Sequence, residues 1–252
     1  MTRNDGRSST ALRPITITRG FTKTPAGSVL WKQGETVLLC TASITPEVPP
    51  WFKSDRAGGW VTAEYVMLPA STPRRKEWPK LGHTDSRGTE IQRIIGRSIR
   101  ASVDLSKIGP HTIALDCQVL QADGGTRTAA ICGAYVALRD AIGKLPAVCP
   151  VPRNLAAGAV NPHVASYAPA TALIDQLAAV SVGIVDGEVR VDLDYNDDSR
   201  AEVDLNIAYT ASGRFVEIQG SAENGAGFSR AWLNEMLDAG VVACEQLMKI
   251  QR

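Results

Sequence analysis

One order of segments occurs twice along this chain, and it constrains the fold more than any other feature. In the first half, apolar segments of strand length precede a glycine turn at residues 121–125 and then an alanine-rich helix. In the second half, further strand-like segments precede a similar turn at residues 219–223 and a long C-terminal helix. Alternating strands and helices are typical of α/β architecture. We therefore predict an α/β (α+β) fold of two similar β–α halves, within a single domain that spans residues 1–252.

The periodicity of the apolar residues gives the position of each expected element. Short apolar or alternating runs predict strands, and apolar residues spaced by three or four predict helices. The expected strands are residues 28–32, 36–42, 60–68, 111–122, 178–185, 189–195, 201–209 and 215–220, and the expected helices are residues 87–103, 126–144 and 228–250. Hairpin turns are expected at residues 33–35, 186–187 and 211–213, and loops at residues 69–84 and 146–162.

Composition limits the classes of protein that remain. The formal net charge is +1, so a nucleic-acid surface would require basic residues to gather in one place. The polar residues 1–14 contain no apolar stretch of signal-peptide length, and no run of about 18 apolar residues predicts a membrane span. The five cysteines form no C-x-x-C pair and the three histidines lack ligand spacing, which predicts reduced, mostly buried thiols and no structural zinc. We expect a cytoplasmic protein with no membrane partner.

Six carboxylates lie between residues 192 and 204. Side chains alternate between the faces of a strand, so Asp192 and Asp194 would share one face, and Glu202 and Asp204 would share a face of the next strand. Such clustered negative charge is repulsive unless a cation offsets it, and Mg²⁺ prefers carboxylate oxygens together with water and phosphate oxygens. The cluster therefore has two interpretations, a divalent metal site or the solvated polar face of a sheet.

A possible anion site lies at the junction between an expected strand and an expected helix, where Gly125, Thr126 and Arg127 follow one another. Glycine allows a tight turn and a close approach to a ligand, and the free N–H groups of a helix N-terminus attract phosphate. The Thr126 hydroxyl can donate a hydrogen bond, and the Arg127 guanidinium can hold two phosphate oxygens. The pattern is not a Walker loop. An ordinary glycine turn before a helix cap is the alternative.

Basic residues gather in the loop and the helix that follow the third expected strand. The loop carries Arg74, Arg75 and Lys76, and the helix carries Arg87, Arg93, Arg97 and Arg100. Such a surface could follow a nucleic-acid backbone, or it could be an ordinary solvated surface. A phosphate site, a metal site and a basic surface in one chain together favour phosphoryl transfer, in which catalysis is mainly positioning and charge neutralisation.

Several stretches resemble the bacterial ribonuclease PH family, and they extend over nearly the whole chain. These are residues 59–65, 90–98, 116–130, 179–184, 193–195 with Asp198 and Asp204, and 216–220. The resemblance implies a ribonuclease PH domain with the duplicated fold of ribosomal protein S5 domain 2, assembled as a homohexamer, a trimer of dimers. It also implies a phosphate-dependent 3′→5′ exoribonuclease, or tRNA nucleotidyltransferase, that trims the 3′ ends of tRNA precursors and can run in reverse.

The resemblance also implies roles for individual residues. Phosphate, the co-substrate, would be bound by Arg87, Gly125, Thr126 and Arg127. Asp198 and Asp204 would be the catalytic residues and would hold Mg²⁺ or Mn²⁺. The loop of Arg74, Arg75 and Lys76 would contact the tRNA, and Arg93 and Arg97 of the basic helix complete the expected RNA-binding set.

Three other functions stay open. A hydrolytic metal-dependent nuclease would also use paired aspartates, but it would release nucleoside monophosphates. A non-catalytic RNA-binding ring subunit would be expected to lack Asp198, Asp204 or Arg127, all of which are present. A small-molecule kinase with the S5-like fold would need a glycine-rich nucleotide loop that this sequence does not contain.

Overall fold

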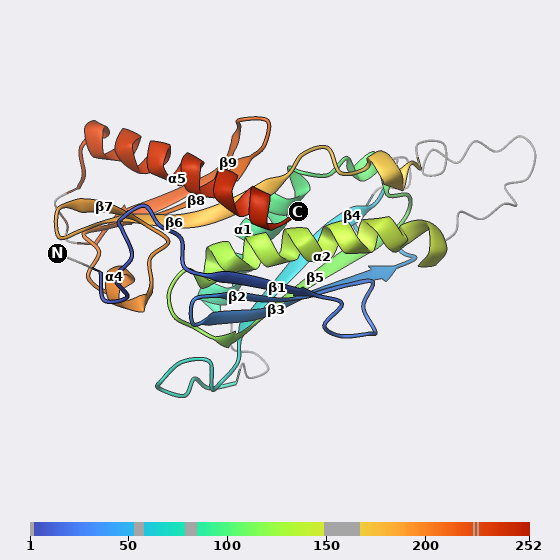
Figure 1. Cartoon of the computed structure of the whole chain (residues 1–252). Coiled ribbons are helices and arrows are strands. Elements are labelled where there is room, and N and C mark those ends of the chain that lie inside the picture. Colours follow the sequence, from blue (N-terminus) through green and yellow to red (C-terminus); the bar gives the residue numbers. More distant parts are fainter. Residues whose placement is uncertain (1–2, 53–57, 79–84, 149–166, 224, 226) are drawn as a thin grey trace, which may run out of the picture.

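The computed structural model describes residues 3–52, 58–78, 85–148, 167–223, 225 and 227–252. Two β-sheets and their helices form stacked layers, with one long helix between the sheets and another outside the second sheet (Figure 1). Within these residues, no helix combines the length and the apolar character that a membrane span requires. The predicted α/β (α+β) class, with a sheet and a long helix in each half, is confirmed.

The first sheet has the strand order β1-β2-β3-β5-β4. Its strands are β1 (Ile15–Arg19), β2 (Gly27–Gln33), β3 (Thr36–Thr45), β4 (Trp60–Met67) and β5 (Thr112–Gln121). All neighbours are antiparallel except β4 and β5, which run parallel. The carboxyl ends of β4 and β5 therefore lie at the same edge, so the basic loop after β4 and the glycine turn after β5 leave the sheet together.

The second sheet has the order β7-β6-β8-β9 and is antiparallel throughout. Its strands are β6 (Leu177–Val185), β7 (Glu188–Val191), β8 (Val203–Thr210) and β9 (Phe215–Ala222). The helices are α1 (Ser86–Arg100), α2 (Thr126–Val148), the short α4 (Tyr195–Asp198) and α5 (Arg230–Ile250), with 3₁₀ turns η1 (Leu105–Lys107) and η2 (Pro169–Thr171). α1 packs on β4 and α2, and α5 covers the outer face of β6, β7 and β8.

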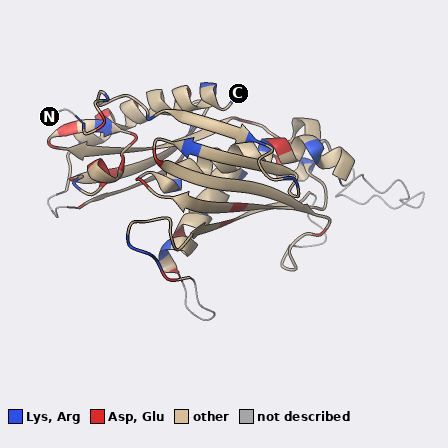
Figure 2. Cartoon of the chain, turned by 60° about the horizontal axis from the view of Figure 1, so that its bottom comes forward, with Lys and Arg blue, Asp and Glu red and all other residues tan. Residues whose placement is uncertain are grey.

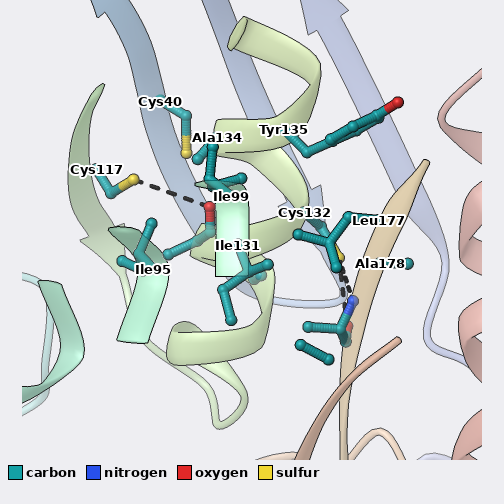
Figure 3. Packing of buried hydrophobic residues seen from close by; sticks show 14 of the residues in the cluster. Cys40, Ile95, Ile99, Cys117, Ile131, Cys132, Ala134, Tyr135, Leu177 and Ala178 are labelled. Atoms are coloured by element: carbon teal, nitrogen blue, oxygen red, sulfur yellow. Dashed lines mark hydrogen bonds between the residues drawn. The ribbon is translucent and has the colours of Figure 1, made fainter. Parts of the chain in front are cut away.

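The helix α2 holds the two sheets together. It contacts β2, β3 and β5 on one side and β6 and β8 on the other, and Figure 3 shows Cys40 and Cys117 of the first sheet and Leu177 of the second around it. A Cβ on Gly27 would lie 1.9 Å from the carbonyl oxygen of Ala137, so the helix backbone touches the first sheet directly. The small residues of α2 allow this close packing, and burial on both sides explains why the helix has no polar face.

Most predicted elements are confirmed to within three residues at their ends, two elements differ by more, and one strand was not predicted. The strand β1 was not predicted, because its Ile-Thr-Ile-Thr alternation is short and lies at a sheet edge. The helix α2 continues past residue 144 to Val148. Pro146 stands in its last turn, so the backbone hydrogen bond that proline cannot donate is lost only close to the end of the helix. The predicted strand 189–195 ends at Val191, and α4 begins at Tyr195. Residues 79–84 and 149–162 of the predicted loops lie outside the described residues.

Candidate functional site

The glycine turn and the acidic segment lie against each other where the two halves of the chain meet. Gly124 and Gly125 follow β5 with left-handed backbone angles, at φ +68° and +62°. A Cβ on Gly124 would stand 2.6 Å from the backbone carbonyl carbon of Asp194. The turn thus requires glycine both for its conformation and for its contact with the segment that leads into α4.

The start of α2 presents backbone donors at this place. The first backbone bond of the helix runs from Ala129 N to Gly125 O at 3.0 Å, so the N–H groups before residue 129 have no intrahelical acceptor. The Thr126 hydroxyl shares a 2.8 Å hydrogen bond with the phenol of Tyr65. Burial raises the pKa of Tyr65 to about 12, so this phenol stays protonated near neutral pH. A phenol that donates to Thr126 leaves the threonine proton available to an anion.

Two arginines face the same place from two helices. Arg127 stands one residue inside α2 and donates from Nη1 to Gln219 Oε1 of β9 at 2.8 Å. Gln219 in turn donates to the Glu90 carboxylate of α1, which fixes the orientation of the amide. Arg87 lies in the first turn of α1 and is exposed, and α1 begins where Asp85 accepts a hydrogen bond from Gly88 N at 3.0 Å.

The predicted cluster of six carboxylates separates into residues with different roles. Asp192 is buried at φ +55° and does not lie on a solvated strand face, because its carboxylate pairs with Arg13 at 2.7 Å. Asp194 caps α4 by accepting from Asp197 N at 2.8 Å. The prediction that Asp192 and Asp194 share a polar strand face is therefore wrong. Long-range contacts end the strand at Val191 in spite of its alternating sequence.

Two more of the six carboxylates lie away from a metal site. The buried Asp197 carboxylate accepts from Arg3 Nε and from Arg190 Nη1, both at 2.7 Å. Glu202 is exposed and accepts from Gly187 N at 3.1 Å in the β6–β7 turn. The protein's own arginines thus offset much of the negative charge that the sequence analysis attributed to a cation.

Asp198 and Asp204 remain as the carboxylates that face the arginines. Burial raises the pKa of Asp198 above its ordinary value, although the charges of Arg87 and Arg127 partly offset this. Burial, and then the negative charge of Asp198, raise the pKa of Asp204 to about 6. Asp204 Oδ2 accepts from Asn206 Nδ2 at 3.3 Å, whereas Oδ1 is buried and has no hydrogen-bond partner.

This carboxylate pair fits a magnesium-type ion. Among the residues that the structure describes, no group of three or more His, Cys, Asp or Glu could hold a metal. Mg²⁺, however, is commonly bound through one or two carboxylates, with water and substrate phosphate as its other ligands. A buried carboxylate oxygen without a donor is costly unless a cation or a proton approaches it, so Asp204 Oδ1 supports a site for such an ion.

The phosphate-site and carboxylate residues line one concave surface. Two adjoining hollows of about 720 Å³ and 550 Å³ share Arg87, Arg127, Asp198, Asp204 and Asn206 as lining residues. We call their common part the central hollow. Gly125 and Thr126 line the second hollow, as do Arg74 and Lys76 of the loop after β4. The structure therefore brings together all the predicted phosphate and catalytic residues.

The other predicted RNA-binding residues lie around this surface. Arg75 is exposed in the same loop but is not among the lining residues of either hollow. Arg93 and Arg97 line a separate hollow of about 390 Å³, and Arg97 pairs with Glu217 at 3.0 Å. Figure 2 shows basic residues gathered on the loop that follows β4. Arg100 does not belong to the expected basic surface, because its guanidinium lies 4.6 Å over the Trp60 ring and donates to a backbone carbonyl.

Several residues of the site were not identified from the sequence. Tyr65 and Gln219 lie within stretches that resemble the ribonuclease PH family, but the resemblance assigned neither residue a role. Arg13 gave no local signal, because its contacts are with residues distant in the sequence. Strand alternation places Asn206 on the same face as Asp204, but the sequence assigned it no role.

The matched family defines the class of protein. The model of domain 1 of the 3′ exoribonuclease family matches residues 11–142, and that of domain 2 matches residues 175–243. The chain therefore belongs to the 3′ exoribonuclease family. Its curated relatives named ribonuclease PH include those of Mycolicibacterium gilvum, 54% identical, and Nocardia farcinica, 52% identical. These alignments cover 99% of this chain and 90% and 91% of the two relatives, so the resemblance to ribonuclease PH is confirmed.

Solved structures support the same fold. An Archaeoglobus fulgidus exosome with RNA bound to the active site matches with a TM-score of 0.79 at 22% identity, over 100% of this chain and 93% of that chain. Rice Rrp46 matches with a TM-score of 0.73 at 18% identity, over 99% and 98% of the two chains. These likenesses agree with the duplicated S5 domain 2-like fold that the resemblance implied.

Proposed function

We propose that this chain is a phosphate-dependent 3′→5′ exoribonuclease that trims the 3′ ends of tRNA precursors and releases nucleoside diphosphates. The observation that carries the proposal is the central hollow, where Arg87 and Arg127 face a pair of carboxylates beside the helix start that lines the second hollow. Family membership and the ribonuclease PH relatives support the same activity.

The proposed reaction needs little chemistry from the protein beyond positioning. Inorganic phosphate lies between Arg87, Arg127 and the turn formed by Gly125 and Thr126, and the last phosphodiester of the RNA lies beside it. A phosphate oxygen forms a bond to the scissile phosphorus while the bond to the RNA 3′ oxygen breaks. The proton of hydrogen phosphate ends on that 3′ oxygen, and the terminal nucleotide leaves as a diphosphate. The reverse reaction adds nucleotides from diphosphates.

The nucleophile requires no strong protein base, since phosphate is already anionic at neutral pH. Arg87 and Arg127 orient it and reduce its repulsion from the RNA phosphate. Asp198 and Asp204 would hold Mg²⁺ or Mn²⁺, which would offset charge on the phosphorus and on the leaving oxygen. These residue roles are proposals that rest on the contacts of the central hollow.

The RNA would extend from the central hollow across the exposed basic residues around it. Arg74 and Lys76 line the same hollow as residues 123–126, which we call the phosphate turn, and Arg75 lies beside them. Arg93 and Arg97 line the separate hollow of about 390 Å³. We propose these five as RNA-backbone contacts. Such contacts depend on salt, so alanine at any of them should weaken RNA binding and reduce its salt dependence.

We also propose a single domain over residues 1–252, a homohexamer built as a trimer of dimers, and a cytoplasmic location. The hollow lined from both halves supports the single domain. Large apolar side chains exposed on β9 and α5, among them Ile218 and Val242, support self-association, which light scattering of the purified protein can test. The four described cysteines are free and buried, which agrees with a reducing compartment.

One assay tests the proposed activity. A tRNA with extra 3′ nucleotides is incubated with and without phosphate, and the products are separated by chromatography. Diphosphates that form only with phosphate are expected. Monophosphates formed without phosphate would instead support the hydrolytic nuclease, and no shortening under either condition would support a non-catalytic RNA-binding subunit.

A further inference from the structure

Arg13 contacts the backbone carbonyls of the phosphate turn and does not line either adjoining hollow. Its Nη1 donates to the backbone carbonyl of Asp123, and its Nη2 lies 3.5 Å from the carbonyl oxygen of Gly124. A Cβ on Gly125 would stand 2.9 Å from the same Nη2. The Arg13 residue is only 4% exposed, and it is not among the lining residues of the two adjoining hollows. Arg13 therefore touches the turn without facing the space where phosphate would lie.

Thr36 contacts the same turn from β3 and shares the Gly124 carbonyl with Arg13. Its hydroxyl donates to Gly124 O at 2.8 Å and accepts from Asp123 N at 3.0 Å. In a planar trans peptide, the carbonyl and the following N–H point in opposite directions. When Arg13 and Thr36 draw the carbonyls of Asp123 and Gly124 inward, the N–H groups of Gly124 and Gly125 are directed away from these two side chains.

The charge of Arg13 is offset within the protein. Its Nη2 and Nε contact Asp192 Oδ1 at 2.7 and 3.1 Å, its backbone N donates to Asp192 Oδ2 at 2.7 Å, and Gln33 Nε2 donates to the same carboxylate at 2.8 Å. The turn is also tied to α4, because Tyr195 N donates to Asp123 Oδ1 at 3.3 Å. Arg13 thus connects the phosphate turn to the segment that carries Asp198.

We propose that Arg13 and Thr36 are positioning residues of the phosphate site, which fix the peptide planes of the turn so that its N–H groups bind inorganic phosphate. The inference rests on the proposed function, since phosphate is the ligand in both. It adds two residues that act through the turn and touch neither substrate.

Thr36→Val is the sharpest test, because it removes both hydrogen bonds to the turn, conserves side-chain shape and leaves every charge paired. Thr41→Val in the same strand is the matched control, since Thr41 bonds to Asp116 and lies away from the turn. Phosphate binding is measured by calorimetry without RNA, and the phosphate KM, RNA KM and kcat are measured in the phosphorolysis assay.

Thr36→Val is expected to weaken phosphate binding and raise the phosphate KM about tenfold, on the order expected when ordinary hydrogen bonds are lost. The RNA KM, and the kcat at saturating phosphate, should stay within about twofold of the control. A merely structural role would instead lower the melting temperature and move all three kinetic constants together.

Arg13→Lys provides a second variant if Thr36→Val does not fold. Lysine keeps the charge opposite Asp192, but its single ammonium cannot reach both carbonyls and the carboxylate as the guanidinium does. The same selective rise in phosphate KM is expected. If the original protein binds phosphate and both variants bind it as tightly as the Thr41→Val control, the positioning role is wrong while the proposed function stands. If the original protein binds no phosphate, the proposed phosphate site itself is wrong.

Discussion

Arg127 and Gln219 meet across the junction of the two halves, where the arginine Nη1 donates to the glutamine Oε1 at 2.8 Å although 92 residues separate them. Gln219 is itself held by Glu90 of α1. The guanidinium of a helix in the first half is therefore oriented by a strand of the second half. The central hollow is complete only when both halves are folded against each other.

Removal of this guanidinium should raise the phosphate requirement. We predict that Arg127→Ala increases the phosphate KM by about 10- to 100-fold, because a charge-assisted hydrogen bond contributes ~1.5–3 kcal/mol. Arg214→Ala, in the exposed turn between β8 and β9, is the control and should leave this KM unchanged. The measurement is initial rate against phosphate concentration at fixed RNA. An unchanged phosphate dependence in Arg127→Ala would remove Arg127 from the phosphate site.

The carboxylate pair should affect turnover more than RNA affinity. We predict that Asp204→Asn lowers kcat by about 100-fold or more, since the negative charge that would hold a cation at the buried Oδ1 is lost. RNA binding measured without phosphate should stay close to that of the unaltered protein. Asp238→Asn, exposed on α5, is the matched control. Normal turnover of Asp204→Asn at limiting Mg²⁺ would contradict the metal role.

Local patterns predicted most elements and the phosphate turn, because these depend on residues close together in the sequence. The periodicity of residues 86–100 and the glycines before α2 are signals of this kind. The alternation from Val191 to Tyr195 also matches a strand, but the buried pairing of Asp192 with Arg13 decides the backbone there, and those residues are 179 positions apart. No local pattern contains that contact.

The acidic cluster also depends on contacts that no local sequence pattern contains. Its charge suggested a cation for all six carboxylates, yet Asp192 and Asp197 are balanced by arginines from the N-terminal segment and from β7. These contacts distinguish Asp192 and Asp197 from Asp198 and Asp204. The resemblance to ribonuclease PH assigned the last two because it used family information, and the charge pattern alone could not separate them.

The Asp192–Arg13 pair should make stability depend on acid pH. Burial alone would raise the pKa of Asp192, but the charge of Arg13 and the hydrogen bonds to the carboxylate outweigh it, so the pKa lies below its ordinary value. A lowered folded-state pKa gives stability that is fully present above the unfolded value, near ~3.9, and is lost as pH falls through the folded value. We predict that Asp192→Asn destabilises the protein by ~3 kcal/mol at neutral pH, since it leaves the buried Arg13 with only the more distant carboxylate of Asp123, at 3.8 Å, as a counter-charge.

The measurement for this pair is urea unfolding of both proteins at neutral pH and at a series of acid pH values below the unfolded pKa of about 3.9. The difference in unfolding free energy should begin to shrink below that value and should continue to shrink as pH falls toward the lowered folded-state pKa, where Asp192 of the unaltered protein becomes protonated. Asp140→Asn, which breaks a pair with the half-exposed Arg19, is the control and should cost less than ~1 kcal/mol at either pH. A difference for Asp192→Asn that is the same at both pH values would argue against a charged pair.

Comparison of Gly124→Ala with Gly20→Ala should distinguish the cost of a left-handed backbone from the loss of the contact between the phosphate turn and Asp194. Gly124 has φ +68° and lies against the backbone of Asp194, whereas Gly20 has φ +66° with no atom within 4 Å of an added Cβ. Gly20→Ala should therefore show the cost of the left-handed backbone alone, about 1 kcal/mol, with normal phosphorolysis. Gly124→Ala must also move the turn away from α4, so we predict a larger loss of stability and at least a ~10-fold fall in kcat/KM for phosphate. Thermal unfolding and phosphate kinetics of the two variants, measured side by side, test this, and equal effects would show that the contact between the turn and α4 has no part in the site.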